Sequence, residues 1–234
     1  MSTIKSSSHR STNRKVFEIL VNQGLLGKNI LDIGAGRGHM TQRIGEFIQK
    51  NGEDPKKHLT ACDRFPRFFE YSAVQCLGLN AGSGLPFSDN SHDIVYALEV
   101  IEHLHNPYDF IHEIQRILRP NGLLLLTTPN VLNLTSRLSY LFNGFFSLFG
   151  PVSFDFAKSR RQHGHIMPFN YYYMTYALKK EGFYDRNLAT DRFKKSSVFM
   201  FIPLFAFLKA SSFKLQSRLA GKHPQIYREN KEDL

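Results

Sequence analysis

The chain has 234 residues, of which 42% are hydrophobic, and it carries a formal net charge of +10 at pH 7. This length suits one large α/β domain with an added segment. Two cysteines are too few for a disulfide framework and match no zinc-ligand spacing, which argues against a disulfide-stapled secreted protein and predicts a reducing, intracellular setting without a structural metal. The basic charge favours anionic partners, namely phosphorylated or carboxylated substrates, an acidic membrane surface or nucleic acid, but it does not choose among them.

The two ends of the chain differ in composition from its centre. Residues 1–14 are polar and basic without the apolar core of a secretory signal, so we predict a mobile basic arm there. Residues 15–234 are predicted to form a single domain. Within it, 131–170 would be a cap insertion, and 196–234 would be an apolar strand followed by a basic tail.

One part of the last segment, residues 197–208, is strongly apolar. Pro203 interrupts this stretch, which falls short of the roughly 20 residues that a membrane-spanning helix needs. We predict a buried strand or hairpin, and an interfacial helix or lipid-facing lid is the alternative.

The pattern of apolar residues alternates between strand and helix from Val16 to Pro129. Strands as apolar as LLLLTT belong inside a sheet that is covered by helices. We therefore predict a Rossmann-like, doubly wound α/β fold with a mostly parallel, seven-stranded sheet. The expected elements are, in chain order, a helix over 16–26, a strand over 29–33, a helix over 39–49, a strand ending at Asp63, a helix over 68–77, a strand near Leu79, a strand over 93–98, a helix over 106–118, a turn at 119–122, a strand over 123–128 and a helix over 171–180.

A glycine-rich turn follows the first strand. Gly34, Gly36 and Gly38 stand at alternate positions, where missing side chains let a ligand approach the backbone. Dehydrogenases use G-x-G-x-x-G with the acid after the turn, whereas here Asp32 precedes the first glycine by two residues. A carboxylate at that place suits a cofactor that carries an ammonium group and would repel a pyrophosphate.

Asp63 stands at the end of the second strand. An acid at this position can accept hydrogen bonds from both hydroxyls of a ribose, as nucleoside cofactors require. The alternative is a surface acid that caps the following segment.

The runs ILDIGAGRGHMTQRI, TACD and LPFSDNSHDIVYALEVIEHLHNPYDFIHEIQRILRPNGLLLLTTPN resemble the class I S-adenosylmethionine-dependent methyltransferases. They are most similar to the type 11/23 group, which includes the ubiquinone-pathway O-methyltransferases. The resemblance covers roughly residues 28–130, with a weaker echo in HGHIMPFN at 163–170. It implies that S-adenosylmethionine is the cofactor.

The resemblance also assigns roles to individual residues. The methionine and ribose part of the cofactor would lie against the glycine turn, with the ribose on Asp63. Asn80 stands where such families often have an aspartate near the adenine amino group, and its amide can still accept through its carbonyl. Leu98 and Glu99 follow the fourth strand, where the family brings backbone close to the sulfonium, although Leu98 is equally consistent with the core. The predicted cofactor-binding residues are Asp32, Gly34, Gly36, Asp63, Arg64, Asn80, Ala81, Leu98 and Glu99.

Methyl transfer needs in-line placement of the acceptor and, for an oxygen acceptor, a base that takes its proton. Titratable groups near the expected site are Glu102 and His103 in EVIEHL, and His163 and His165 in RQHGHIMPF. We predict Glu102, His103 and His165 as catalytic residues and expect no metal. The alternative for each histidine is a hydrogen-bonded structural role. Cys62 is expected to be a packing residue, like the other cysteine.

These features predict an enzyme that methylates an oxygen of a small, lipid-linked or glycan-linked anionic metabolite. The aromatic residues of the expected cap and the Arg160–Arg161 pair suit such an acceptor, although the aromatics could equally pack among themselves. The Asn/Asp-Pro-Pro-aromatic signature of methyltransferases that act on nucleic acid bases is missing, so we do not expect a nucleic acid partner.

The alternative functions are a membrane- or RNA-associated module that retains the fold, a nucleic-acid methyltransferase, and a nicotinamide-dependent dehydrogenase. We expect a cytoplasmic protein. Peripheral contact with a membrane is a further alternative.

Overall fold

The computed structural model of the protein describes residues 4–79, 84–151, 164–184 and 186–192, with a few further positions between 209 and 217. They divide into two compact units. The first lies within 1–129 and 151–168, and the second lies within 130–150 and 169–234. The predicted cap over 131–170 has residues in both units, and the predicted single domain over 15–234 stays a prediction.

A parallel sheet forms the centre of the first unit. At the carboxyl end of β1, Ile33 is paired with Cys62 of β2 and with Ala97 of β4. The carboxyl ends of these strands therefore meet at one edge of the sheet, which is where open α/β sheets bind ligands. The strands lie in the order β3-β2-β1-β4-β5 and are β1 (Ile30–Ile33), β2 (Leu59–Asp63), β3 (Cys76–Gly78), β4 (His92–Leu98) and β5 (Leu118–Thr127).

The sheet confirms the predicted Rossmann-like parallel arrangement. Within the described part of the chain it has five strands rather than the predicted seven. The strand expected within 196–208 lies outside the described residues, so the two further strands stay a prediction.

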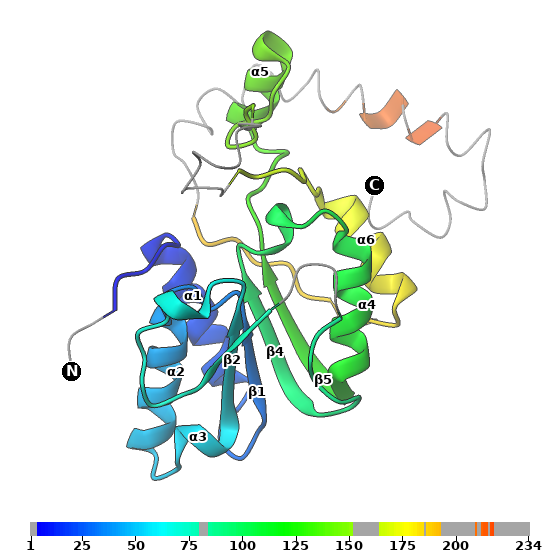
Figure 1. Ribbon diagram of the computed structural model, residues 1–234. Helices are drawn as coiled ribbons and strands as arrows, with labels where there is room; N and C mark the ends of the chain where they lie inside the picture. Colours follow the sequence, from blue (N-terminus) through cyan, green and yellow to red (C-terminus); the bar gives the residue numbers. More distant parts are fainter. Residues whose placement is uncertain are drawn as a thin grey trace. The chain divides into compact units, whose positions relative to one another are not determined.

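Helices cover both faces of this sheet. α1 and α2 lie together on one side, and α4 lies on the other (Figure 1). Asn106 caps α4 by accepting hydrogen bonds from the backbone amides of Tyr108 and Asp109, so this helix starts where the sequence pattern places it. The helices of the first unit are α1 (Arg10–Asn22), α2 (His39–Lys50), α3 (Pro55–His58) and α4 (Pro107–Ile117).

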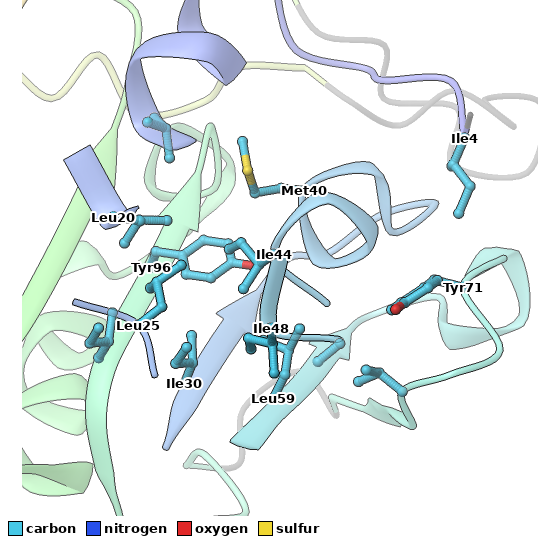
Figure 2. Packing of buried hydrophobic residues seen from close by; sticks show 14 residues of the cluster. Ile4, Leu20, Leu25, Ile30, Met40, Ile44, Ile48, Leu59, Tyr71 and Tyr96 are labelled. Carbon is cyan, nitrogen blue, oxygen red and sulfur yellow. The ribbon is translucent and has the colours of Figure 1, made fainter. Parts of the chain in front are cut away.

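The hydrophobic core fills the space between α1, α2 and one face of the sheet (Figure 2). Ile30 of β1 and Tyr96 of β4 pack with Ile44 and Ile48 of α2, and Leu20 joins them from α1. All five side chains are at most 1% exposed. Ile44 and Ile48 are one helical turn apart, so the spacing that predicts the helix also places both on its buried face. This packing fixes the position of the loop between β1 and α2.

The segment before α1 falls within the predicted mobile arm over 1–14. Ile4 is buried, its amide donates to the Gln42 side chain at 3.0 Å, and its carbonyl oxygen lies 2.6 Å from the His39 Nδ1 atom. α1 already begins at Arg10. One buried apolar residue and two hydrogen-bonding partners on α2 therefore hold this segment in the structure, and its mobility stays a prediction.

The predicted helix over 68–77 does not form. The chain makes one 3-10 turn, η1 (Pro66–Phe68), and then runs irregularly to β3. The Tyr71 ring lies against Gly45 of α2 and is only 5% exposed, so tertiary packing of an aromatic side chain overrides the helical spacing. As a result, Cys76 belongs to a strand and not to a helix.

Both cysteines are free thiols on neighbouring strands. Cys62 is buried and Cys76 is half-buried. Burial raises the pKa of the Cys62 thiol far above its ordinary value and that of Cys76 to about 12. Both therefore stay neutral, which suits the packing role expected of them.

The predicted turn at 119–122 forms within β5 rather than before it. Leu118 pairs with His92 and Leu123 pairs with Ile94, so the four turn residues loop out opposite a single residue of β4. The apolar run that follows then continues beside β4 to the carboxyl edge of the sheet.

The described part of the second unit contains two regular helices, α5 (Leu134–Asn143) and α6 (Tyr171–Lys180). Asn133 caps α5 and Asn170 caps α6, each through its side-chain oxygen. Across the described residues, no helix has both the length and the apolar composition to cross a bilayer.

Candidate cofactor and catalytic site

The glycine turn connects β1 to α2 at the carboxyl edge of the sheet. The amides of Gly34 and Ala35 donate to the carbonyl of Cys62, at 2.8 and 3.1 Å, which fastens the turn to the end of β2. Gly34, Gly36 and Gly38 have φ angles of 74°, 56° and 90°, a region that favours glycine. A Cβ atom at Gly34 would collide with the Val100 side chain, whereas at Gly36 no atom lies within 4 Å. Backbone is therefore open to a ligand at Gly36.

Asp63 faces this turn from the end of β2. Its Oδ2 accepts a hydrogen bond from the Gly36 amide at 2.8 Å, and its Oδ1 accepts one from the Phe65 amide at 2.7 Å. Each carboxylate oxygen has a further lone pair, so both can still accept from ribose hydroxyls. The Phe65 contact also realises the capping alternative, since Phe65 precedes η1. One carboxylate thus joins the glycine turn, the following segment and the predicted ribose position.

Arg64 follows directly and is exposed. Its guanidinium carbon lies 5.4 Å from the centroid of the Phe65 ring, within the range of a cation–π contact. Asn80 and Ala81 lie outside the described residues, so their predicted contact with the cofactor stays a prediction.

Asp32 lies beneath the turn rather than at its surface. Its side chain is buried, with 3% of the residue exposed, and Oδ2 accepts a hydrogen bond from the Thr41 hydroxyl at 2.5 Å. Burial raises the pKa of Asp32 to about 7, although the Thr41 hydrogen bond opposes the rise. The carboxyl therefore supports the turn from below, and its direct contact with a cofactor ammonium stays a prediction.

The end of β4 lies beside the same turn. Glu99 has a φ of 53°, in the left-handed region, and its amide donates to the carbonyl and hydroxyl oxygens of Thr127 at 3.1 and 3.0 Å. Backbone strain of this kind is concentrated at functional sites. Leu98 packs against the hydrophobic core, which agrees with the core alternative for its side chain. The contact between Val100 and Gly34 links this strand end to the glycine turn.

Glu102 belongs to a short 3-10 turn, η2 (Ile101–His103), directly after β4. The residue is fully buried, at 0% exposure. Burial raises the pKa of its carboxyl to about 7, and the charge of Glu99 adds to the rise. A carboxyl with this pKa can take up or release a proton near neutral pH.

His165 reaches Glu102 and His103 from a distant segment of the chain. The His103 and His165 rings lie 4.9 Å apart between centroids, edge to face. The amides of Ile166 and Met167 donate to the carbonyl of Glu102 at 2.9 and 3.0 Å, which fixes the segment against η2. The structure therefore brings the three predicted catalytic residues together.

The tautomer of His103 follows from its partner. Nδ1 lies 3.2 Å from the carbonyl oxygen of Gly164, and because a carbonyl can only accept, Nδ1 carries the proton. Nε2 is then the basic nitrogen of the neutral ring. His163, the other histidine of that motif, lies outside the described residues.

Glu102, His103 and His165 also have the composition of a cation site. One ligand atom from each lies within 4.8 Å of the others. Imidazole nitrogens with a carboxylate suit a divalent transition metal, a use that the sequence did not predict. The cluster can therefore transfer protons or hold a cation.

Two further residues of the site were not predicted from the sequence. Thr41 and Thr127 position the site through hydrogen bonds that no motif marks.

Three comparisons bear on this site. Residues 31–126 match the model of a family described as a methyltransferase domain. A probable S-adenosylmethionine-dependent methyltransferase of Mycolicibacterium smegmatis is 33% identical over 109 residues, or 44% of this chain and 39% of that protein. The mitochondrial ubiquinone biosynthesis O-methyltransferase of Schizosaccharomyces pombe is 33% identical over 111 residues, or 44% of this chain and 38% of the relative. The match thus spans about two fifths of the length of each relative.

The fold is also similar to a solved structure. A "putative methyltransferase" of Bacillus halodurans superposes with a TM-score of 0.53 at 19% identity, over 74% of this chain and 68% of that one. The fold, the glycine turn and the family match together identify residues 31–126 as a class I methyltransferase domain, whose cofactor is S-adenosylmethionine. Within that class, the chain is similar to a ubiquinone-pathway O-methyltransferase, a member of the group that the sequence motifs resemble.

Proposed function

We propose that this protein methylates an oxygen of a small, lipid-linked or glycan-linked anionic metabolite. The observation that carries the proposal is the convergence of three features at one sheet edge: the open glycine turn, Asp63, and the Glu102–His103–His165 cluster. The packing of Val100 against Gly34 joins the cluster to the turn. The proposed cofactor site and the proposed proton-accepting group would therefore lie on neighbouring strand ends.

The residues present fit the cofactor. Gly34 and Gly36 would lie along its methionine and ribose part, and Asp63 would accept hydrogen bonds from its ribose. S-adenosylmethionine, when bound there, supplies an electrophilic methyl group. The protein must then place the acceptor in line and exclude water.

His103 is our candidate for the base. Its Nδ1–H donates to the Gly164 carbonyl, and in this proposal Nε2 accepts the proton of an acceptor hydroxyl. Glu102 and His165 lie close enough to exchange protons with this ring or to orient it. A metal held by the same residues is the alternative use of the cluster.

Two observations support the type of acceptor. The name of the Schizosaccharomyces pombe relative states O-methylation, and the net charge of +10 favours an anionic substrate. The free cysteines agree with a reducing, cytoplasmic setting.

Calorimetric titration with S-adenosylhomocysteine tests the cofactor site. We expect wild-type protein to bind it and Asp63→Ala to bind at least about tenfold more weakly, because hydrogen bonds to a carboxylate contribute about 1.5–3 kcal/mol. Asp93→Ala is the matched control. Its carboxylate accepts from the Asn29 amide at 2.8 Å and pairs with Arg119, but at the opposite end of the sheet. It should bind like wild type, and no binding by folded wild-type protein would remove the proposal.

Methyl transfer to the acceptor tests the catalytic assignment. A mass-spectrometric assay against hydroxylated, anionic lipids and sugars, with RNA as a comparison, should detect a mass gain on an oxygen acceptor. His103→Gln should lower kcat by about a hundredfold, the range of general base catalysis, while leaving S-adenosylhomocysteine affinity unchanged. Equal loss of affinity and rate would assign His103 to cofactor binding instead.

A further inference from the structure

The second unit exposes large apolar side chains on α5 and on the turn that follows it. Leu141, Phe142 and Leu148 are 73%, 77% and 68% exposed. Tyr140 and Phe145 are also exposed. We call these five residues the apolar tip. Contiguous exposed apolar residues on a folded protein mark a contact with a partner or a membrane.

The apolar tip is a structured surface. The rings of Tyr140 and Phe146 stack with their centroids 4.6 Å apart. The Ser139 hydroxyl donates to the Phe145 carbonyl at 2.8 Å, and the Ser147 amide donates to the Ser136 hydroxyl at 3.0 Å. These contacts hold the turn against α5, so local structure maintains the exposure of the tip.

The segment that carries the tip is almost uncharged, whereas the second unit as a whole is basic. From Asn130 to Gly150 the sequence contains no acidic residue and one basic residue, Arg137. The second unit as a whole carries 13 Lys and Arg against 6 Asp and Glu, a net charge of +7 out of the +10 of the chain. The first unit has 17 against 14, or +3.

We infer that the apolar tip inserts into the interfacial region of an anionic lipid bilayer. Tyr, Phe and Leu side chains are those that partition into this region, and a basic unit is attracted to acidic headgroups. A second copy of the chain fits less well, because it would bring two units of charge +7 together. The inference goes beyond the proposed methyl transfer and does not depend on it.

Co-sedimentation with vesicles tests the inference. The full chain should bind vesicles of phosphatidylcholine that contain a minor share of phosphatidylglycerol, should bind pure phosphatidylcholine more weakly, and should lose affinity as the salt concentration rises. The double variant Leu141→Glu/Phe142→Glu should reduce the partition coefficient at least about tenfold, because two apolar side chains no longer enter the bilayer. Leu26→Glu, which adds a charge at an exposed leucine of the first unit, should bind like wild type.

The outcomes are separable. S-adenosylhomocysteine binding without lipid, measured on each variant, shows that the first unit is folded and reports on the proposed function independently. Binding of the double variant as tight as wild type would overturn the inference, as would no vesicle binding by wild type. Self-association is tested by sedimentation velocity. If wild type is a dimer, the double variant is a monomer and neither binds vesicles, the tip is a self-association surface and the inference is overturned.

Discussion

The carboxyl edge of the sheet in the first unit and the apolar tip of the second unit use their side chains in opposite ways. At the sheet edge, apolar residues are buried beneath the turn, and the surface presents open backbone at Gly36 and polar groups such as Asp63. At the apolar tip, Leu141 and Phe142 face solvent while the polar groups of the turn are hydrogen-bonded internally. The first arrangement suits a polar nucleoside, and the second suits an apolar medium.

The largest expected effect contrasts two aliphatic side chains from the two regions. Ile44→Ala removes a fully buried side chain from the core of the first unit and should cost about 3 kcal/mol of unfolding free energy, because it leaves a cavity. Leu141→Ala at the apolar tip should change it by less than about 0.5 kcal/mol, since the side chain is 73% exposed. Urea denaturation measures both. A cost for Leu141→Ala as large as that for Ile44→Ala would show that the tip belongs to a core.

The next effect separates backbone strain from close packing at the glycine turn. Gly34→Ala should lower the free energy of unfolding by about 2 kcal/mol more than Gly52→Ala does. Both glycines have left-handed φ angles, 74° and 86°, but only at Gly34 does a Cβ atom meet a side chain, that of Val100. The loss of unfolding free energy in Gly52→Ala therefore measures only the cost of placing alanine at a left-handed φ, about 1–2 kcal/mol.

Urea denaturation and S-adenosylhomocysteine titration check this pair of variants. Gly34→Ala should also weaken cofactor binding, and Gly52→Ala should not. Equal costs for the two substitutions would show that the packing of Val100 on the turn is unimportant.

The smallest effect concerns the buried carboxyl under the turn. Burial raises the pKa of Asp32 to about 7, so the folded state keeps a proton that the unfolded chain releases above about pH 4. The stabilisation is complete at low pH and is lost as the pH rises toward 7. Asp32→Asn lacks this loss of stability. Its free energy of unfolding relative to wild type should therefore rise by about 1 kcal/mol between pH 5.5 and pH 6.5.

Parallel urea titrations of wild type and Asp32→Asn at several pH values measure this difference, from which the other titrating groups cancel. A difference that stays constant with pH would show that Asp32 is already ionised in the folded protein at pH 5.

The sequence predicted the local parts of the site well. The glycine turn depends on residues that are neighbours in the chain, and the end of β2 follows from a short apolar run that stops at Asp63. The helix expected over 68–77 failed because Tyr71 packs on Gly45, a contact between distant residues that local spacing does not encode. The contacts of Ile4 with α2 are likewise contacts between distant residues, and local spacing does not encode them.

The sequence by itself determined a parallel α/β fold, a glycine-rich turn after the first strand and an acid at the end of the second, because periodicity and glycine spacing are properties of consecutive residues. Only the tertiary structure decided that Asp32 faces the interior and that His165 joins Glu102 and His103. It also decided that the aromatic side chains after residue 139 include exposed ones. These outcomes depend on which distant segments pack together, and packing is settled by the burial of whole surfaces rather than by any short stretch of chain.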